Sequence, residues 1–237
     1  MLRIMFLIPK NWVLRHKRKY SAVALCHRLR HKVFMSQSPV SFETLSTALQ
    51  GAQHLSHTSD FDLNSDAWPN GVDLRPAAVL LPLIERATGL HVVLTKRAAN
   101  LRNHPGQIAF PGGKVDATDI NPQAAALRES QEEIGLSILD TTVLGGLPNH
   151  ETVTGFDVHL FVAKVNPSFI AIADANEVEE VFEVPLAHVL TPENYLIEGR
   201  IWQGKMRRYY VVPFGPYYIW GATARMLRGL AERMGQV

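Results

Sequence analysis

A short helix that follows a pair of glycines constrains this chain more than any other feature. Asn121 followed by Pro122 is typical of a helix start, and Gly135 supplies the stop. The sequence therefore predicts a helix over residues 122–134. The Gly112–Gly113 pair stands before it, and glycine lets the backbone approach a ligand closely. We expect a glycine loop that leads into about three turns of helix.

The predicted helix has two unlike faces. Leu127 and Ile134 fall on one side, which we expect to be the core face. The opposite side carries three carboxylates, those of Glu129, Glu132 and Glu133. Like charges at this spacing repel by roughly a few tenths of a kcal/mol per pair, so the patch is unfavourable unless a cation lies on it. Convergent carboxylates suit Mg²⁺ or Mn²⁺, whereas three glutamates taken alone also fit an ordinary solvated face.

Two neighbouring features favour the metal interpretation. The Gly112–Gly113 loop would bring a phosphate close to a metal on the helix. Arg128 stands four residues before Glu132, so the two side chains are expected to pair and to hold one carboxylate in a fixed rotamer. Together these features indicate a site for a metal ion and a phosphate.

This segment resembles the Nudix box, usually written Gly-x5-Glu-x7-Arg-Glu-apolar-x-Glu-Glu-x-Gly-apolar. Residues 128–136 fit its second half, with Ser130 at the usual apolar position. In the first half Asp119 stands where the box has glutamate, and eight residues rather than seven separate it from Arg128. The resemblance implies that divalent ions, which activate diphosphate hydrolysis in that family, are bound here by Glu129, Glu132 and Glu133.

A basic stretch stands directly before the glycines. Residues 94–111 carry four basic side chains, Lys96, Arg97, Arg102 and His104. Their charge suits an anionic substrate, although a solvated basic loop is the plain alternative.

The same stretch closely resembles the extra motif that precedes the box in the coenzyme A diphosphatase branch of the Nudix family. That motif reads roughly Leu-Leu-Thr-x-Arg-Ser-x-x-Leu-Arg-x-His-x-Gly-Gln-x-x-Phe-Pro-Gly-Gly, and here Ala98 replaces its serine. Both motifs in this order are more specific than either alone. We expect the substrate to be bound by Arg97, Arg102 and His104 and by the backbone of Gly112 and Gly113.

The base that deprotonates the attacking water stays open between Glu132 within the box and Glu180 outside it. Residues 176–186 resemble an acidic segment, followed by an apolar-Pro-Leu run, that Nudix proteins often have, and Glu177 or Glu180 would reach the metal from there. An exposed acidic edge fits these residues equally well. Residues 152–156 resemble a Thr-x-Thr-Gly-aromatic loop that would frame the substrate, though turn chemistry also explains them.

Apolar runs around these motifs predict the remaining elements. Residues 79–84 and 90–94 are expected to form two antiparallel strands around a turn, with Pro82 placing the first at an edge or a bulge. Further strands are expected at 143–147, 158–165 and 206–214. A helical stripe should pack on the sheet through Trp220, Ala224, Leu227, Ala231 and Met234.

Composition and charge divide the chain into three parts. Its 237 residues, 46% hydrophobic, allow one sizeable core. Residues 1–34 hold nine Lys or Arg and no acidic residue, which leaves 15 basic against 22 acidic residues elsewhere. We therefore expect a basic N-terminal extension at 1–34, a lead-in helix and linker at 35–74, and the Nudix domain at 75–235.

The basic extension is open to three interpretations. It is a basic arm for nucleic acid or anionic lipid, an organelle-type presequence, or an upstream translation of a chain that starts at Met35. Its apolar fragment, residues 4–9, is far shorter than a membrane span. The single cysteine, Cys26, excludes an internal disulfide, and without a good signal peptide a cytoplasmic location is expected.

The resemblance implies an α/β fold, the Nudix α/β/α sandwich with a mixed sheet. It implies metal-dependent hydrolysis of the diphosphate of coenzyme A or acyl-CoA to 3′,5′-ADP and 4′-phosphopantetheine. A broader nucleoside diphosphate hydrolase acting on NADH, ADP-ribose or oxidised nucleotides is the alternative, and a catalytically idle nucleotide-binding module is a further one. We expect a small-molecule substrate and neither a membrane nor a nucleic-acid partner; a homodimer stays open.

Overall fold

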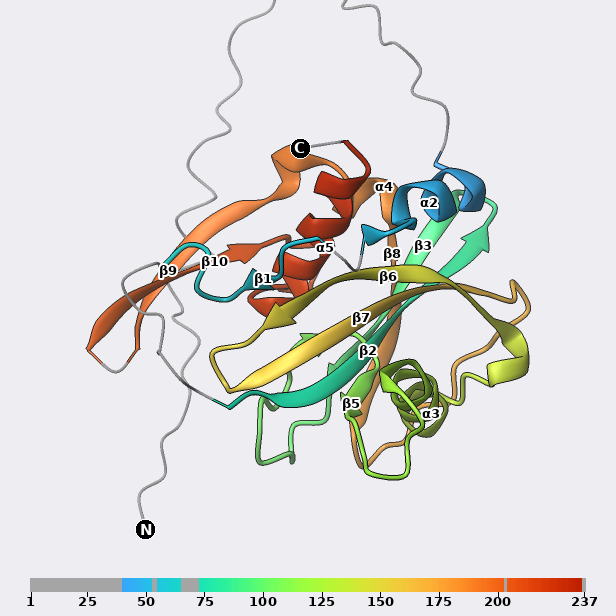
Figure 1. The fold of residues 1–237 in the computed structure, drawn as a ribbon, viewed down its shortest axis with the longest axis horizontal. Coiled ribbons are helices and arrows are strands. Elements are labelled where there is room, and N and C mark those ends of the chain that lie inside the picture. Colours follow the sequence, from blue (N-terminus) through green and yellow to red (C-terminus); the bar gives the residue numbers. More distant parts are fainter. Residues whose placement is uncertain (1–39, 53–54, 65–72, 203, 236–237) are drawn as a thin grey trace, which may run out of the picture. The chain divides into compact units, whose positions relative to one another are not determined.

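The computed structural model describes residues 40–52, 55–64, 73–202 and 204–235 (Figure 1). Residues 39–237 fall into one compact unit. The basic extension predicted at 1–34 lies outside the described residues, and the limits predicted at 35–74 and 75–235 stay a prediction. None of the helices in the described ranges is long and apolar enough to cross a membrane.

One mixed sheet of eight strands runs through the molecule (Figure 1). Its order is β1-β6-β7-β2-β3-β4, with β5 also pairing with β2 and β8 with β3. The β2–β7 and β1–β6 pairs are parallel and the others antiparallel. The strands are β1 (Thr58–Ser59), β2 (Arg75–Arg86), β3 (Gly89–Arg97), β4 (Ile108–Ala109), β5 (Gly112–Lys114), β6 (Thr141–Glu151), β7 (Phe156–Val165) and β8 (Val178–Pro185).

Helices cover both faces of this sheet. Side chains alternate along β2, so Leu81 and Leu83 enter one core cluster while Leu80 and Ile84 enter the other. The helix α3 (Pro122–Ile134) packs on the second cluster, and α2 (Phe42–Leu49) and α5 (Ala222–Arg233) on the first (Figure 1). The predicted α/β/α sandwich with a mixed sheet is confirmed.

The strand β2 lies inside the sheet, so the expectation that Pro82 marks an edge strand was wrong. Along one side β2 pairs with β7 from residue 75 to residue 84. Along the other it pairs with β5 at residues 77–79 and with β3 from Leu83 onwards. The N–H of Leu80, two residues before Pro82, points to the same side of β2 as the Pro82 nitrogen, and it donates to the Pro111 carbonyl at 2.9 Å. Pro82 is tolerated because its missing N–H falls where the neighbouring strand changes.

The helix α3 has the bounds that its sequence predicts. The Asn121 side chain accepts a hydrogen bond from the Ala124 N–H at 2.8 Å, and Gly135 ends the helix with φ 70°. The Ser130 hydroxyl is buried and donates to the Ala126 carbonyl at 2.7 Å, so a polar residue is tolerated at the usual apolar position. The buried face of α3 differs from the one expected, because it includes Glu133, while Leu127 is only partly buried.

The segment predicted as a linker contains structure of its own. The helix α2 lies where a lead-in helix was expected, and the capping Ser41 accepts from the Thr44 N–H. Beyond it, β1 pairs with the end of β6, and Phe61 is buried. The described residues between 55 and 64 therefore belong to the folded body.

The C-terminal part adds a hairpin and short helices. The strands β9 (Leu196–Trp202) and β10 (Lys205–Val211) form a separate two-stranded sheet. The short helices of this part are α4 (Leu186–Val189) and the 3-10 turn η4 (Pro192–Asn194), and a further 3-10 turn, η3 (Ile138–Asp140), lies between α3 and β6. On α5 the predicted stripe buries Ala224, Leu227 and Ala231, whereas Trp220 stays partly exposed.

We predict that Asn121→Ala lowers the free energy of unfolding by about 1 kcal/mol, because the first turn of α3 loses its side-chain cap. Denaturant titration of wild type and variant measures this. The control is Gln131→Ala, an exposed site on the same helix, expected to change stability by less than about 0.5 kcal/mol. Equal losses in both variants would contradict the capping argument.

Candidate metal and phosphate site

The Glu133 carboxylate joins α3 to the glycine loop. Its side chain is only 4% exposed and accepts a hydrogen bond from the Gly112 N–H at 3.1 Å. A guanidinium nitrogen of Arg97 lies 3.8 Å away. Burial raises the pKa of Glu133 to about 7, against the opposing effects of the Gly112 N–H and Arg97, and the Glu129 and Glu177 charges raise it further. The buried carboxylate is therefore poorly compensated by the protein alone.

The Glu129 carboxylate lies one turn earlier on the same side of α3, against the second glycine. A Cβ atom at Gly113 would lie 2.5 Å from the Glu129 carboxyl carbon, so this carboxylate occupies the space that glycine leaves open. Partial burial raises the pKa of Glu129, and its ion pair with Arg128 opposes that shift. Gly113 is therefore required by the close approach of Glu129.

Arg128 holds the acidic side chains of this region together. Its guanidinium donates two hydrogen bonds to Asp119, both at 3.0 Å, and one to each of Glu129 and Glu132, also at 3.0 Å. A fifth hydrogen bond reaches the Lys114 carbonyl at 3.3 Å. The expected pairing of Arg128 with Glu132 is present. The bonds from Arg128 are the largest cause that lowers the pKa of Asp119, so Asp119 is held as a charged partner of Arg128.

The three box glutamates are not equivalent. Glu129 and Glu133 face the glycine loop, whereas the Glu132 side chain is 59% exposed and paired with Arg128. Among the described residues, no group of three His, Cys, Asp or Glu side chains is arranged as a complete metal cage. Two partly desolvated carboxylates with raised pKa values still fit a divalent cation, because Mg²⁺ commonly binds through one or two carboxylates and keeps several waters.

In the basic motif, residues 94–111, Arg97 lies at this site, whereas Arg102 does not pair with the described glutamates. Arg97 ends β3, and its backbone is hydrogen-bonded to Gln107 and Gly106 across the loop. His104 has φ 53°, the one positive value at a non-glycine among the described residues. Partial burial and then the Arg97 charge lower the pKa of His104. Arg102 is exposed, and within the described ranges no hydrogen bond or ion pair joins it to the glutamates.

Of the two acidic residues outside the box, Glu177 acts on the carboxylates of α3. Its charge raises the pKa of both Glu129 and Glu133. Glu180 instead accepts a hydrogen bond from the Tyr217 hydroxyl at 2.5 Å. The sequence already indicated Glu177, because Glu177 and Glu180 belong to the same acidic segment, residues 176–186.

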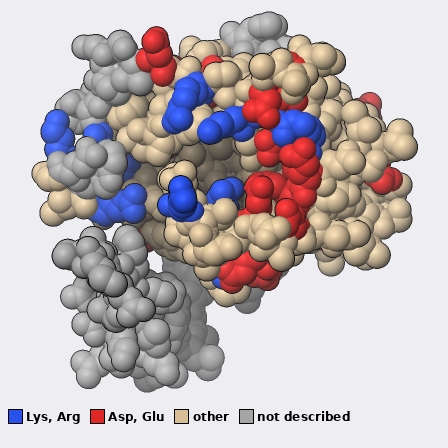
Figure 2. Space-filling view, turned by 90° about the horizontal axis from the view of Figure 1, so that it is seen from below, with Lys and Arg blue, Asp and Glu red and all other residues tan. Residues whose placement is uncertain are grey.

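The surface around the site is divided by charge. Figure 2 shows a hollow in this face, with acidic side chains gathered along one rim and basic side chains along others. The view is from below Figure 1, the side on which α3 lies. Such a surface combines groups that attract a cation with groups that attract an anion.

Comparison with known proteins is consistent with this geometry. A family model described as the NUDIX domain matches residues 73–206. The chain belongs to the Nudix family. Relatives from Salmonella paratyphi B and Salmonella newport, each described as an uncharacterized Nudix hydrolase NudL, are 43% identical over 162 residues, which cover 68% of this chain and 83% of each relative. This Nudix protein is accordingly a hydrolase.

Solved structures are more distant. A Nudix hydrolase from M. smegmatis, RenU, has a TM-score of 0.40 at 22% identity and covers 51% of this chain and 83% of its own. The NUDIX domain of Shewanella oneidensis NrtR, solved with ADP ribose, has a TM-score of 0.44 at 15% identity and covers 74% and 97%.

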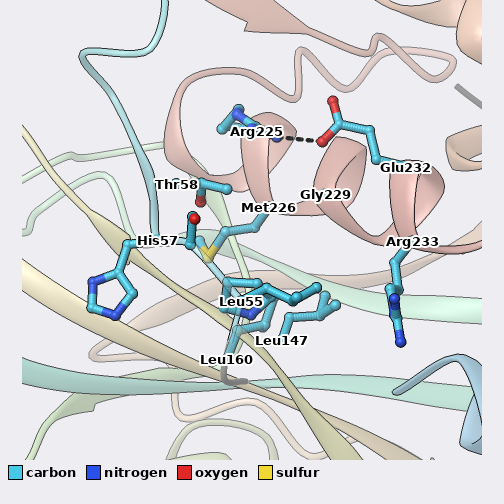
Figure 3. A pocket seen from close by; sticks show the side chains of 12 residues that line it. Leu55, His57, Thr58, Leu147, Leu160, Arg225, Met226, Gly229, Glu232 and Arg233 are labelled. Atoms are coloured by element: carbon cyan, nitrogen blue, oxygen red, sulfur yellow. Dashed lines mark hydrogen bonds and ion pairs between the residues drawn. The ribbon is translucent and has the colours of Figure 1, made fainter. Parts of the chain in front are cut away.

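One pocket of the described residues lies away from the box. It has a volume of about 510 Å³ and is lined from α5, β6, β7 and residues 55–58. Figure 3 shows Leu147, Leu160 and Met226 within it, and Arg225 paired with Glu232 at 3.2 Å. None of the glutamates of α3 lines it, so its size does not make it the site of the chemistry.

We predict that Gly113→Ala weakens metal binding while leaving the fold nearly intact, because its Cβ meets only the movable end of Glu129. Calorimetric titration with Mg²⁺ or Mn²⁺ and thermal unfolding measure the two effects. The contrasting variant is Gly112→Ala, whose Cβ would lie 2.4 Å from the Ala78 carbonyl at φ 151° and which should lose at least about 2 kcal/mol of stability. Unchanged metal affinity in Gly113→Ala would refute the argument.

We predict that Glu133→Gln stabilises the metal-free protein at high pH. The folded-state pKa of about 7 lies above the ordinary 4.5, so the wild type loses stability as pH rises between these values. The variant cannot ionise, and its advantage should grow to at most roughly 3 kcal/mol above pH 7 and vanish below about 4.5. Unfolding with a chelator present at several pH values tests this; an advantage independent of pH would exclude ionisation as its cause.

Proposed function

We propose that this Nudix hydrolase cleaves the diphosphate of coenzyme A or acyl-CoA, giving 3′,5′-ADP and 4′-phosphopantetheine or its acyl form. The supporting observation is the 3.8 Å approach of Arg97, from the basic motif, to Glu133, from the box. Through this contact, a guanidinium that would attract phosphate, that of Arg97, lies beside a carboxylate that would bind a metal, that of Glu133. The motif that resembles the coenzyme A branch supplies the choice of substrate.

The residues divide the work according to their positions. Glu129 and Glu133 would hold Mg²⁺ or Mn²⁺, which when bound neutralises phosphate charge and activates a water. Arg128 orients Glu129 and Glu132, and the Gly112 N–H fixes Glu133.

On the substrate side, Arg97, Arg102 and His104 would contact the phosphates, with Gly112 and Gly113 allowing close approach. A base must take the proton of the attacking water, and the candidates are Glu132, Glu177 and Glu180. Glu177 is favoured, since its charge already acts on Glu129 and Glu133. We place this reaction in the cytoplasm.

The test is product analysis after incubation with coenzyme A and Mg²⁺ or Mn²⁺. We expect release of 3′,5′-ADP and phosphopantetheine, and a loss of at least about a hundredfold in Glu133→Gln, because several kcal/mol of transition-state charge stabilisation is removed with the metal. Glu85→Gln, at an exposed site of β2, is the matched control and should retain activity.

Other outcomes assign a different function. Cleavage of NADH or ADP-ribose without cleavage of coenzyme A would keep the metal site and overturn the substrate. Binding of nucleotides without turnover of any of them would favour an idle binding module.

A further inference from the structure

A second pocket lies beyond His104, between the β9–β10 hairpin and the start of α5. Its volume is about 160 Å³, and its lining residues include Asp60, His104, Arg200, Arg208, Tyr209 and Trp220. Val153 and Thr154, from the loop that was expected to frame a substrate, also line it. Ligand sites for whole small molecules are commonly about 300–1,000 Å³, so this pocket is the size of a subsite.

One wall of the pocket is aromatic and cationic. The Arg200 guanidinium carbon lies 4.7 Å from the centre of the Trp220 ring and 6.0 Å from that of Tyr209. The two rings meet edge to face, with centroids 5.1 Å apart and an angle of 61°. A guanidinium placed over an indole ring keeps N–H groups available to a ligand. This wall suits a planar base beside an anion.

Positive charge exceeds negative charge in this pocket. Within the described part of the chain, Arg200 forms no ion pair with a carboxylate, whereas the Arg208 side chain lies on the opposite face of the hairpin, because Arg208 pairs with Gly199. The carboxylate of the lining residue Asp60 is already engaged, because it accepts from the Val153 N–H at 2.9 Å and lies 3.2 Å from His150 Nε2. An anionic group would therefore meet the Arg200 guanidinium without a competing carboxylate.

His104, which lines the pocket, belongs to the basic motif that also carries Arg97. Arg97 touches Glu133 at one end of the loop, and the Arg97 and Arg200 charges both act on His104. At the other end the Thr223 hydroxyl, in the first turn of α5, donates to the Ile108 carbonyl at 3.0 Å. The basic motif thus has Arg97 beside a carboxylate of α3 and His104 in the pocket with Arg200, as an extended substrate would require.

We propose that this pocket binds the nucleoside 3′-phosphate end of the substrate, with the purine against the Arg200–Trp220 pair and the phosphate monoester on Arg200. The proposal rests on the proposed function and deepens it. Coenzyme A carries one phosphate that is not cleaved, on its ribose, and NADH and ADP-ribose lack it. The pantetheine arm is uncharged and would form no ion pair with Arg200. The positive charge of the pocket therefore favours the nucleotide half of coenzyme A.

The experiment is calorimetric titration of the full chain with adenosine 3′,5′-bisphosphate and with AMP, both in Mg²⁺. Wild type should bind the bisphosphate at least about tenfold more tightly, which corresponds to about 1.4 kcal/mol. Arg200→Ala, and separately Arg200→Gln, should remove most of this preference while leaving AMP binding within about threefold. Lys205→Ala, the same loss of charge on the same hairpin but outside the pocket, is the matched control and should keep the preference.

The outcomes separate this proposal from the proposed function. Equal affinity of wild type for both nucleotides, or an equal loss of the preference in Lys205→Ala and Arg200→Ala, overturns the pocket whatever the enzyme cleaves. A preference lost only in the arginine variants supports the pocket even if coenzyme A is not hydrolysed. Thermal unfolding of each variant identifies a loss that comes from misfolding, and the second arginine variant then decides.

Discussion

The site depends on one hydrogen bond, from the Gly112 N–H to the buried carboxylate of Glu133. It joins the glycine loop, which β2 holds through β5, to the last turn of α3, which packs on the same strand. A carboxylate removed from water here costs free energy unless a donor or a cation compensates it. The fold therefore keeps a buried and poorly compensated carboxylate at the point where a bound cation would stabilise its charge.

Arg128 limits the cost of gathering so many carboxylates. By pairing with Asp119, Glu129 and Glu132 it fixes the loop before α3 to the helix surface. Asp119, which stands where the box has glutamate, therefore has a role of its own. It accepts two hydrogen bonds from Arg128, and these orient the guanidinium toward the other carboxylates. The longer spacing in this part of the box is accommodated by the loop, while the helix is unaffected.

The two halves of the proposed substrate site have different origins. The metal half is local, since the glycine loop and α3 follow one another in the chain. The pocket beyond His104 is assembled from distant segments, and the hydrogen bonds between Asn64 and the Arg208 backbone, at 2.8 and 2.9 Å, tie the β1 region to the hairpin. A hydrolase built this way can keep its chemistry while the pocket changes with its substrate.

The sequence by itself determined α3 from Pro122 to Ile134, because an asparagine cap and a glycine stop are local signals. It also determined which residue types meet at the site. Only the tertiary structure decided that Glu133 is buried and Glu132 exposed, and that β2 is an interior strand despite Pro82, because burial and strand neighbours depend on segments far apart in the chain. For the same reason Trp220, expected in the core, lies in a pocket wall beside Arg200.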